Sequence, residues 1–345
     1  MTKIPVLKIA GLAALFLGTV SPAMAQTTQL NMVLNWKYQG PQGWFFLAED
    51  RGYFAEEGIE LLMDQGNGSG AAVPLVANGT YDVGFGDINA LVELTATQEG
   101  NMPKAVFMLY NQPPFAIAVK SDSDIMSADD LNGRMLGGPA SDGALKLFPA
   151  FCDLADLDCD SIEVTNMQPN LREQMLMNEQ IEGAFGYVNT LRFGAMAMGV
   201  NVDEDLRFIR YGDFGMDLYS NAIIVSADLI ENQPEVVEGL VRAINRGVKD
   251  ALADPQAAVE AVADREPLID FDLELARFNA TVEDEMAHPE IAEIGLGAVD
   301  MDRLAESIDI LVAANELPRT PEAEAIFDPS FLPPIEDRLT SVSID

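Results

Sequence analysis

Along the first half of this chain, segments whose apolar residues have the spacing of a β-strand alternate with segments whose apolar residues have the spacing of a helix. Short apolar runs that fit strands are each followed by a longer stretch with apolar residues at helical spacing. The predicted strands are residues 30–34, 59–63 and 81–85, and the predicted helices are residues 43–51, 71–77 and 88–97. Strands that alternate with helices at this spacing indicate parallel βαβ units, in which ligand sites form at the carboxyl ends of the strands. The loops after these strands are therefore the first place to look for function.

A second alternating series begins near residue 135. Its predicted strands are residues 135–136, 162–165 and 183–187, and its predicted helices are residues 144–151 and 171–177. The apolar β-type runs 106–110, 115–119 and 221–225 read as passages between two α/β lobes. We therefore expect lobe I to comprise residues 26–114 and 220–345, and lobe II to comprise residues 115–219.

The last third of the chain has helical spacing. From residue 234 onward one apolar stripe contains Val236, Val237, Leu240, Val241 and Ile244. We interpret this mostly helical part as the outer wall of lobe I.

Residues 1–25 have the pattern of a secretory signal peptide. Lys3 and Lys8 surround the start of an apolar stretch, and Ala23-Met24-Ala25 supplies small residues for cleavage before Gln26. The stretch is shorter than the roughly 20 apolar residues that a permanent span needs, and no later segment resembles a span. We expect a monomer in the periplasm that does not insert into the membrane.

The charge balance is strongly acidic. The chain has 20 basic and 56 acidic residues, which gives a formal net charge of −36. Such a chain repels phosphate backbones and anionic lipid, so nucleic acid is excluded as an expected partner. Because 48% of the residues are apolar, the acidity indicates a solvated surface over ordinary cores and not disorder.

Cys152 and Cys159 are the only cysteines. In an exported chain their proximity permits a disulfide. One continuous helix would hold them about 10 Å apart, beyond the roughly 7 Å that a disulfide tolerates, so a disulfide requires the helix to end between them. Disulfide and free thiols both stay open. We expect no metal site, because the only histidine, His288, is far away in the sequence.

Several segments form a combined pattern. They are Leu34-Asn35-Trp36 with residues 48–54 and 57–59, then residues 75–84, and residues 128–133. Together they resemble importer solute-binding proteins related to thiamine-pyrimidine synthase, a family that also includes sulfonate-, taurine- and nitrate-binding proteins. The likeness covers most of residues 30–250.

The resemblance implies an α/β, two-lobed type II periplasmic binding protein fold with a ligand cleft between the lobes. It also implies that a small molecule is captured by lobe closure and delivered to the membrane permease of an ABC-type importer. Relatives are assigned to pyrimidine precursors of thiamine, riboflavin, taurine and other sulfonates, or nitrate, so the ligand stays open. Docking of the loaded protein on a chemosensory receptor also stays open.

The candidate ligand-binding residues lie in the loops after predicted strands or are aromatic residues near them. They are Asn35, Trp36, Gly68, Ser69, Gly70, Asp87, Asn89, Tyr110, Ser141, Asp142, Tyr187, Asn189 and Tyr211. The polar members can hydrogen-bond a ligand, and the aromatic members can sandwich a flat one. A second interpretation also holds, in which the glycine-rich loop is a tight turn and Asp87, Ser141 and Asn189 cap helices.

An enzyme of the synthase branch is the nearest alternative. The resemblance would then require a histidine in the cleft and a cysteine-rich run, but His288 lies beside Pro289 in the last third of the chain. We therefore expect neither an enzyme nor a cofactor. The candidate loops supply Asp87 and Asp142 but no lysine or arginine, and the nearest cation is Arg172. This favours a pyrimidine-type nitrogen heterocycle over a sulfonate or nitrate, because like charges repel strongly in a dry cleft.

Overall fold

The computed structural model describes residues 1–2 and 27–343. The predicted signal peptide, apart from its first two residues, and the cleavage site before Gln26 lie outside the described residues. Every helix in the described part of the chain is too short or too polar to span a bilayer.

Lobe I is built around a five-stranded sheet with the order β2-β1-β3-β10-β4. Its strands are β1 (Thr28–Val33), β2 (Ile59–Asp64), β3 (Val83–Asp87), β4 (Lys104–Met108) and β10 (Asn221–Val225). Strand β1 pairs in parallel with β2 and β3, whereas β10 is antiparallel to β3 and β4. The carboxyl ends of β1, β2 and β3 therefore lie at one edge of the sheet.

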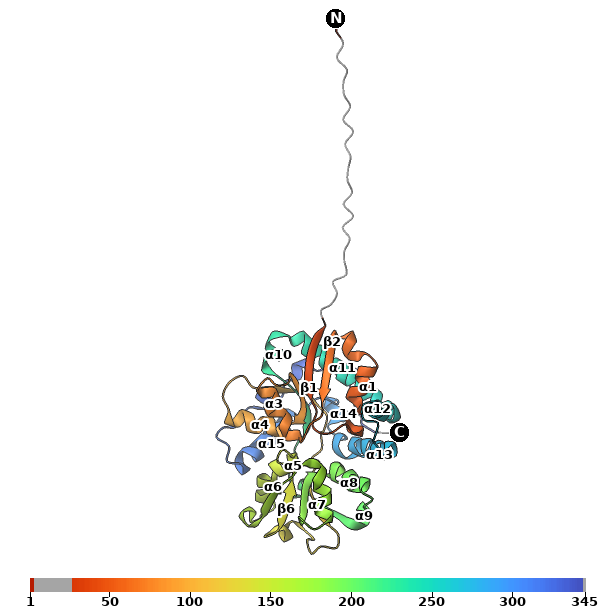
Figure 1. The fold of residues 1–345 in the computed structure, drawn as a ribbon. Helices are drawn as coiled ribbons and strands as arrows, with labels where there is room; N and C mark the ends of the chain where they lie inside the picture. The colour runs from red at the N-terminus through yellow and green to blue at the C-terminus, as the bar shows by residue number, and fades with distance from the viewer. Residues whose placement is uncertain (3–26, 344–345) are drawn as a thin grey trace.

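Helices cover both faces of this sheet (Figure 1). The helices early in the chain are α1 (Gly43–Asp50), α2 (Tyr53–Glu56), α3 (Ser69–Ala77) and α4 (Ile88–Thr97). The later helices are α10 (Ala227–Asn232), α11 (Pro234–Ala253), α12 (Pro255–Ala263), α13 (Phe271–Thr281), α14 (Ile291–Ile294), α15 (Met301–Ala314) and α16 (Ala323–Ile326). The predicted stripe on α11 is mostly buried, with Val237, Leu240, Val241 and Ile244 facing inward, and α11 and α12 pack against α1.

Lobe II contains a second five-stranded sheet, with the order β7-β6-β8-β5-β9. Its strands are β5 (Phe115–Lys120), β6 (Met135–Gly138), β7 (Glu163–Asn166), β8 (Gly183–Tyr187) and β9 (Leu206–Arg210). Its helices are α5 (Gly143–Lys146), α6 (Phe148–Leu154), α7 (Arg172–Met177), α8 (Val188–Ala197) and α9 (Val202–Asp205). As in lobe I, parallel strands end at an edge that faces the other lobe (Figure 1).

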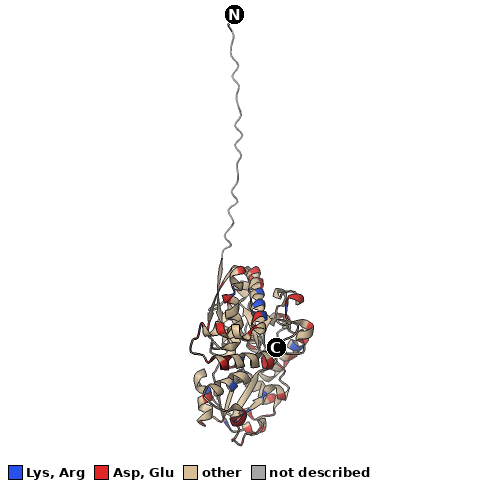
Figure 2. Ribbon diagram, turned by 90° about the vertical axis from the view of Figure 1, so that its right-hand side faces the viewer, with Lys and Arg blue, Asp and Glu red and all other residues tan. Residues whose placement is uncertain are grey.

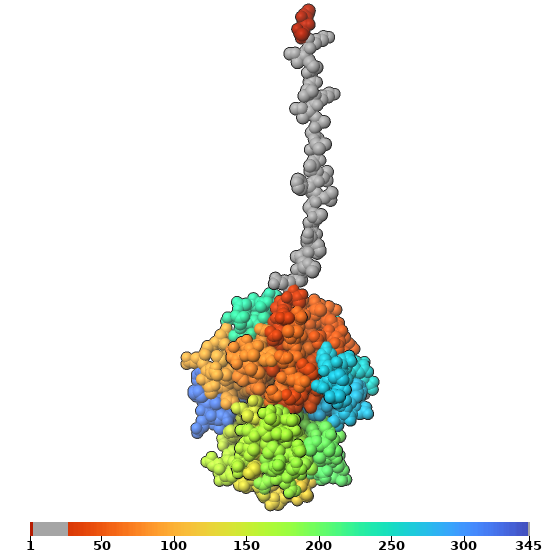
Figure 3. Space-filling model, in the orientation of Figure 1, coloured from red at the N-terminus to blue at the C-terminus, as the bar shows by residue number. Residues whose placement is uncertain are grey.

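The chain passes between the two sheets twice. The first passage is residues 109–114, between β4 and β5, and the second is residues 211–220, between β9 and β10. On the face in Figure 3, lobe II (green) lies directly against lobe I along their boundary.

Cys152 and Cys159 form a disulfide, with their Cα atoms 6.0 Å apart. The geometry follows the sequence argument, because α6 ends at Leu154 and Cys159 begins a separate 3₁₀ turn.

The outer-wall interpretation of the last third is wrong for one segment. Helix α13 contacts α8 of lobe II instead of lying only on the outside of lobe I. It continues into a π-helical segment, η6 (Val282–Met286). This segment brings polar side chains to the boundary between the lobes.

Acidic residues are distributed over both lobes (Figure 2). The basic residues of α11 are paired with some of them. Arg242 bonds Glu57 at 2.7 Å, and Arg246 bonds Glu56 at 2.6 Å.

Candidate functional site

Loops of the two lobes touch on one side of the cleft. The Gly70 N–H donates to the Ser141 carbonyl oxygen at 3.1 Å. The Tyr187 hydroxyl, at the end of β8, lies 2.9 Å from Ser69 Oγ at the start of α3. We call Gly68, Ser69, Gly70, Ser141 and Tyr187 the contact side, because lobe I and lobe II bond there to each other.

The Tyr187 hydroxyl also reaches the second passage between the lobes. It lies 2.7 Å from Ser220 Oγ and 3.0 Å from Asn221 Oδ1. The phenol therefore joins β8 of lobe II both to α3 and to the start of β10. Burial raises its pKa, so it stays protonated and available as a donor.

Gly68 brings the two backbones together. Its φ of +139° is one that glycine adopts readily and other residues rarely do. A Cβ atom built on Gly68 would lie 2.4 Å from the Ser141 carbonyl oxygen of lobe II. The predicted glycine-rich loop is thus used for close approach of the lobes.

Asp87 ends β3 and caps α4. Its Oδ1 accepts from the Asn89 N–H at 3.1 Å and from Asn89 Nδ2 at 2.7 Å. A Cβ on Gly143 of lobe II would lie 2.8 Å from Asp87 Oδ2, so the carboxyl faces the other lobe. Burial raises the pKa of Asp87 to about 7, the negative charge of Asp142 raises it further, and the Asn89 hydrogen bonds oppose the rise.

Asp142 caps α5 and forms an ion pair. Its Oδ1 accepts from the Ala144 N–H at 2.9 Å, and its Oδ2 lies 3.2 Å from Arg172 Nη1. Burial raises the pKa of Asp142, whereas Arg172 lowers it.

The capping interpretation is therefore right for Asp87 and wrong for two other positions. Asp142, not Ser141, is the N-cap of α5, and Tyr187, not Asn189, occupies the N-cap position of α8.

A narrow cavity lies on the other side of the cleft. Its volume is about 20 Å³, which is room for about one water molecule. It is lined by Asn35, Trp36, Gln39, Pro41, Gln42, Tyr110, Tyr187, Asn189, Thr190, Arg277, Thr281 and Glu285. We call the part formed by Asn189, Arg277, Thr281 and Glu285 the cavity side.

Arg277 is held rigidly in this wall. Its Nε and Nη2 donate to Glu274 at 3.0 and 3.2 Å, and Glu274 also accepts from the Gly40 N–H at 2.7 Å. Arg277 is only 3% exposed, and its Nη1 has no hydrogen-bond partner among the described residues.

Glu285 lies in the same wall and is also buried. Burial raises its pKa to about 8, the charge of Asp284 adds to the rise, and the N–H groups of Asn189 oppose it. No well-formed hydrogen bond joins Asn189 to Glu285, and within the described part of the chain the buried Asn189 Nδ2 has no partner. A carboxyl and an unpaired amide N–H therefore lie near each other at the cavity.

The aromatic candidates divide into two groups. Trp36 and Tyr110 line the cavity. Trp36 has the Arg172 guanidinium 5.5 Å from its ring centre, and Tyr110 packs edge-to-face on Phe85 at 5.5 Å. Asn35, beside Trp36, accepts from Gln42 at 2.9 Å and so is fixed within the lobe I wall.

Tyr211 does not line the cavity. It lies in the core of lobe II, where its ring stacks on Phe151 at 4.1 Å and its hydroxyl donates to the Ala144 carbonyl oxygen at 3.0 Å. Its role in the structure is packing.

Sequence reasoning missed Arg277, Thr281 and Glu285. They follow one another at intervals of four, beside the apolar series Phe278, Val282 and Met286. The sequence signal for these residues was a polar stripe next to an apolar stripe on one helix. Charged residues are rarely buried unless they are paired or functional, so such a stripe beside a buried face can indicate a site.

His288 lies away from the cavity. Its Nδ1 is 3.6 Å from Glu290 Oε2, and burial lowers its pKa. Glu290 also accepts from Asn111 of the first passage at 2.7 Å and from Tyr219 of the second at 2.8 Å. The described residues contain no group of three or more His, Cys, Asp or Glu side chains arranged to hold a metal ion.

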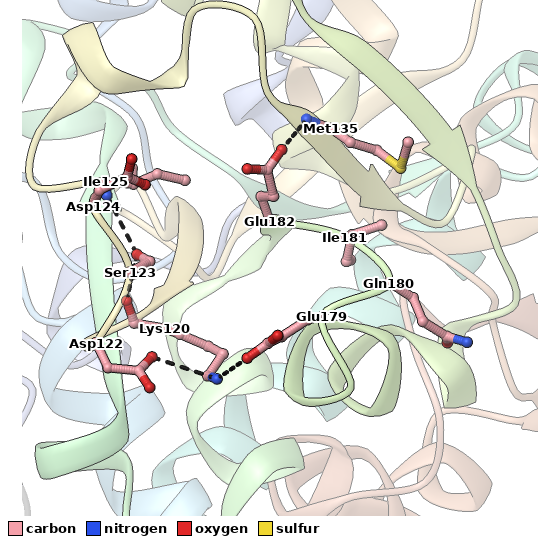
Figure 4. A pocket seen from close by; sticks show the side chains of 10 residues that line it. All are labelled: Lys120, Asp122, Ser123, Asp124, Ile125, Met135, Glu179, Gln180, Ile181 and Glu182. Carbon is pink, nitrogen blue, oxygen red and sulfur yellow. Dashed lines mark hydrogen bonds and ion pairs between the residues drawn. The ribbon is translucent and has the colours of Figure 1, made fainter.

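A larger hollow of about 570 Å³ lies in lobe II, outside the cleft (Figure 4). Its charged side chains pair with one another. Lys120 lies 3.4 Å from Asp122 and 2.6 Å from Glu179, and the Met135 N–H donates to Glu182 at 2.9 Å. These pairs occupy the charged groups of the hollow, whereas the loops after the parallel strands meet at the cleft, so the cleft is the better candidate site.

The chain has relatives among known proteins. A family model described as NMT1/THI5 like matches residues 43–258. The chain is 27% identical over 297 residues to the riboflavin-binding protein RibY of Chloroflexus aurantiacus, covering 84% of this chain and 82% of that protein. It is 22% identical over 243 residues to a 4-amino-5-hydroxymethyl-2-methylpyrimidine phosphate synthase of Legionella pneumophila, covering 70% of this chain and 74% of that protein.

A solved structure has the same fold. It is the ligand-binding component of an ABC-type import system from Staphylococcus aureus, solved with zinc bound, with a TM-score of 0.66 and 12% identity. The similarity covers 91% of this chain and 99% of that one. The predicted α/β periplasmic binding protein fold and the predicted family resemblance are thereby confirmed.

Proposed function

The chain belongs to the NMT1/THI5-like family, and from this premise we propose that it is the periplasmic solute-binding component of an ABC-type importer. It captures a flat nitrogen heterocycle between lobes I and II and presents it to a membrane permease. The observation that carries this proposal is the cavity between the lobes, where the aromatic rings of Trp36 and Tyr110 occur together with unpartnered buried donors of Asn189 and Arg277.

The lining of the cavity suits a flat ring with polar edges. Aromatic side chains supply surface for stacking, and a few polar groups fix the orientation of a ligand. Two relatives have names that involve riboflavin or an aminopyrimidine, which are both flat nitrogen heterocycles. These names support the class of ligand and leave its identity to experiment.

The charges disfavour an anionic ligand. The candidate loops supply no lysine or arginine, and Arg172 was predicted to be the nearest cation. Arg277 also lines the cavity, but Glu274 already neutralises it through two hydrogen bonds. Arg172 is likewise paired with Asp142 and Glu173. A sulfonate or nitrate would have to displace a carboxylate from one of these buried pairs, and breaking a buried ion pair is costly.

The synthase alternative has less support in the site. The family resemblance implies a cleft histidine for that reaction, but His288, the only histidine of the chain, pairs with Glu290 outside the cavity. The two cysteines are joined in a disulfide of lobe II. We therefore infer binding without chemistry.

Lobe closure is the proposed capture mechanism. A cavity of about 20 Å³ is far below the roughly 300 Å³ of a small ligand pocket, so the lobes must separate to admit a heterocycle. The contacts of Gly70 with Ser141 and of Tyr187 with Ser69 would break and form again. Residues 109–114 and 211–220 are the natural hinges, because only they connect the two sheets.

A melting-temperature screen tests the function. The purified protein is heated with riboflavin, 4-amino-5-hydroxymethyl-2-methylpyrimidine, taurine, another alkanesulfonate, nitrate, or histidine with pyridoxal phosphate. At a 100-fold excess over Kd a true ligand adds about 2.7 kcal/mol, which raises the melting temperature by roughly several degrees. Stabilisation by a heterocycle supports the proposal. Stabilisation only by a sulfonate or nitrate, or only by histidine with pyridoxal phosphate, contradicts it.

A further inference from the structure

The cavity side owes its geometry to a change in helix type. Thr281 ends α13, and Val282–Met286 continue as a π-helix. In an α-helix a step of four residues overshoots a full turn by about 40°, so a series at this spacing drifts around the axis. The wider π-helical winding reduces the drift and keeps Glu285 in line with Arg277 and Thr281. Short π-helical segments occur frequently at functional sites.

The donors of the cavity side are unusual. Asn189 is 1% exposed and Arg277 is 3% exposed, yet Asn189 Nδ2 and Arg277 Nη1 have no partner in the described part of the chain. A buried donor without a partner costs about 1–3 kcal/mol, and most buried polar groups have one. Both residues line the cavity, so a ligand in the cavity can supply the missing acceptors.

Glu285 supplies the complementary group. It is 3% exposed and lines the cavity together with Asn189. The wall thus presents the Asn189 amide donor beside the Glu285 acceptor. Arg277 Nη1, the second unpartnered donor, lies farther along the helix face that carries Glu285.

We propose that Glu285 and Asn189 together recognise one edge of the ligand, a ring-borne N–H donor beside an acceptor atom, and that Arg277 Nη1 donates to a second acceptor. A cyclic amide and an aminopyrimidine both present such an edge. The inference rests on the proposed function, since it requires a heterocycle in this cavity. It makes Glu285 the residue that determines specificity.

The balance of charge restricts the ligand to neutral rings. Glu274 neutralises Arg277 through hydrogen bonds of 3.0 and 3.2 Å, so the guanidinium offers a directed N–H rather than an unbalanced charge. Asp284 beside Glu285 pairs with Arg192 at 3.4 Å, so among the described residues this part of the wall has no unbalanced positive charge that would attract an anion.

The test compares ligands that differ only in the donor. Calorimetry measures the Kd values of riboflavin and 3-methylriboflavin, and of 4-amino-5-hydroxymethyl-2-methylpyrimidine and its 4-dimethylamino analogue. The variants are Glu285→Met, which removes the acceptor at similar length, and Glu285→Gln, which keeps a carbonyl acceptor. The matched control is Glu283→Gln, because Glu283 is exposed in the same π-helical segment. Circular dichroism and urea unfolding establish that each variant is folded.

The expected result is a change in selectivity. The parent protein binds the N–H member of one pair about 10-fold more tightly than the methylated member, because the methyl group leaves a buried acceptor without its donor, which costs about 1–3 kcal/mol. Glu285→Met reduces this preference below about 3-fold, whereas Glu285→Gln retains most of it and Glu283→Gln all of it. The pair that shows the preference distinguishes a cyclic amide from an aminopyrimidine.

Two outcomes overturn the inference alone. Either the parent protein binds a heterocycle but does not prefer the N–H member, or Glu285→Met keeps the full preference. In both cases the proposed function stands, because a heterocycle still binds. If no heterocycle binds the parent protein, the proposed function fails, and the inference fails with it.

Discussion

On the contact side of the cleft, the two lobes form hydrogen bonds with each other. On the cavity side, two buried hydrogen-bond donors line a cavity between the lobes. Gly70 donates to Ser141 at 3.1 Å, and the Tyr187 hydroxyl lies 2.9 Å from Ser69 Oγ. By contrast, Asn189 Nδ2 and Arg277 Nη1 have no partner in the described residues. The hydrogen bonds of the contact side favour closure of the lobes. The unpartnered donors of the cavity side favour binding of a ligand.

This difference separates affinity from selectivity. A substitution on the contact side changes the free energy of lobe closure. It should therefore change the affinity for every ligand by the same factor. A substitution on the cavity side changes the hydrogen bonds made to one ligand, so it should change the ratio between ligands. The following tests address the two sides in turn.

Gly68→Ala should have the largest effect. The new Cβ would lie 2.4 Å from the Ser141 carbonyl oxygen, and the backbone φ of +139° is strained for alanine. Overpacking costs about 1–3 kcal/mol and the strain about 1–3 kcal/mol more, so we expect all ligands to bind about 300-fold more weakly, which is ~3.5 kcal/mol. Calorimetry with the screened ligand measures the loss.

The matched control is Gly79→Ala. Gly79 also has a positive φ, of +76°, but nothing lies within 4 Å of an added Cβ. It should lower stability without lowering affinity. If Gly68→Ala binds like Gly79→Ala, the close approach to Ser141 does not control closure.

Glu285 should make the stability of the protein depend on pH. Its pKa is raised to about 8 in the folded state because the carboxyl is buried, so the folded state keeps a proton that the unfolded state loses. The favourable contribution is present near pH 4 and is lost as the pH rises through about 8.

Urea unfolding at pH 5 and pH 9 measures this contribution, in 1 M salt to screen the other acidic groups to a range of about 3 Å. Between these pH values the parent protein should lose on the order of 2 kcal/mol relative to Glu285→Gln. Glu283→Gln, the exposed control, should follow the parent protein. A constant difference between the parent protein and Glu285→Gln would contradict the burial of an ionisable group on the cavity side.

The contact side could be anticipated from the sequence because it follows from topology. Parallel strands place their following loops at one edge of the sheet, so the loops after β2 and β3 and those of lobe II had to meet near the cleft. Gly68, Ser69, Ser141 and Tyr187 were therefore predicted from the sequence to lie at the cleft, as ligand-binding residues. Which of these side chains face a ligand, and which face the other lobe, depends on side-chain direction, which strand order does not determine.

The cavity side could not be placed in this way. Arg277 and Glu285 lie on a helix far along the chain, and helical spacing predicts which face is buried but not what the face is buried against. The contact of α13 with α8 comes from tertiary packing. Tyr211 shows the opposite difficulty: it was predicted to bind the ligand but lies in the core of lobe II. An aromatic residue at the end of a strand can fill a core as well as a cleft. The α/β class of the fold, in contrast, was readable from the alternation of strands and helices.

Tyr187→Phe should have a smaller effect than Gly68→Ala. The hydroxyl lies within 3.0 Å of Ser69 Oγ, Ser220 Oγ and Asn221 Oδ1, so its removal breaks the link between the lobes without a clash. A lost buried hydrogen bond costs about 1–2 kcal/mol, which corresponds to roughly 10-fold in affinity for every ligand. Small-angle scattering should show a more extended average shape without ligand. Tyr187 also lines the cavity, so a change in the ratio between two ligands, instead of a uniform loss, would mean that its hydroxyl contacts the ligand.

Asp87→Asn gives the smallest expected effect and distinguishes the two sides most directly. Asp87 was predicted from the sequence to bind the ligand, but its Oδ1 is occupied by Asn89 and its Oδ2 faces Gly143, and it does not line the cavity. If closure buries this carboxyl, closure must cost free energy above its pKa of about 7, where the group carries a charge. Asparagine keeps the cap of α4 and removes the charge.

The variant should therefore bind every ligand a few-fold more tightly than the parent protein at pH 9 and by a smaller factor at pH 5, as titrations at both pH values would reveal. Weaker binding of Asp87→Asn at both pH values, and of one ligand more than another, would mean that Asp87 contacts the ligand and that the contact side extends into recognition.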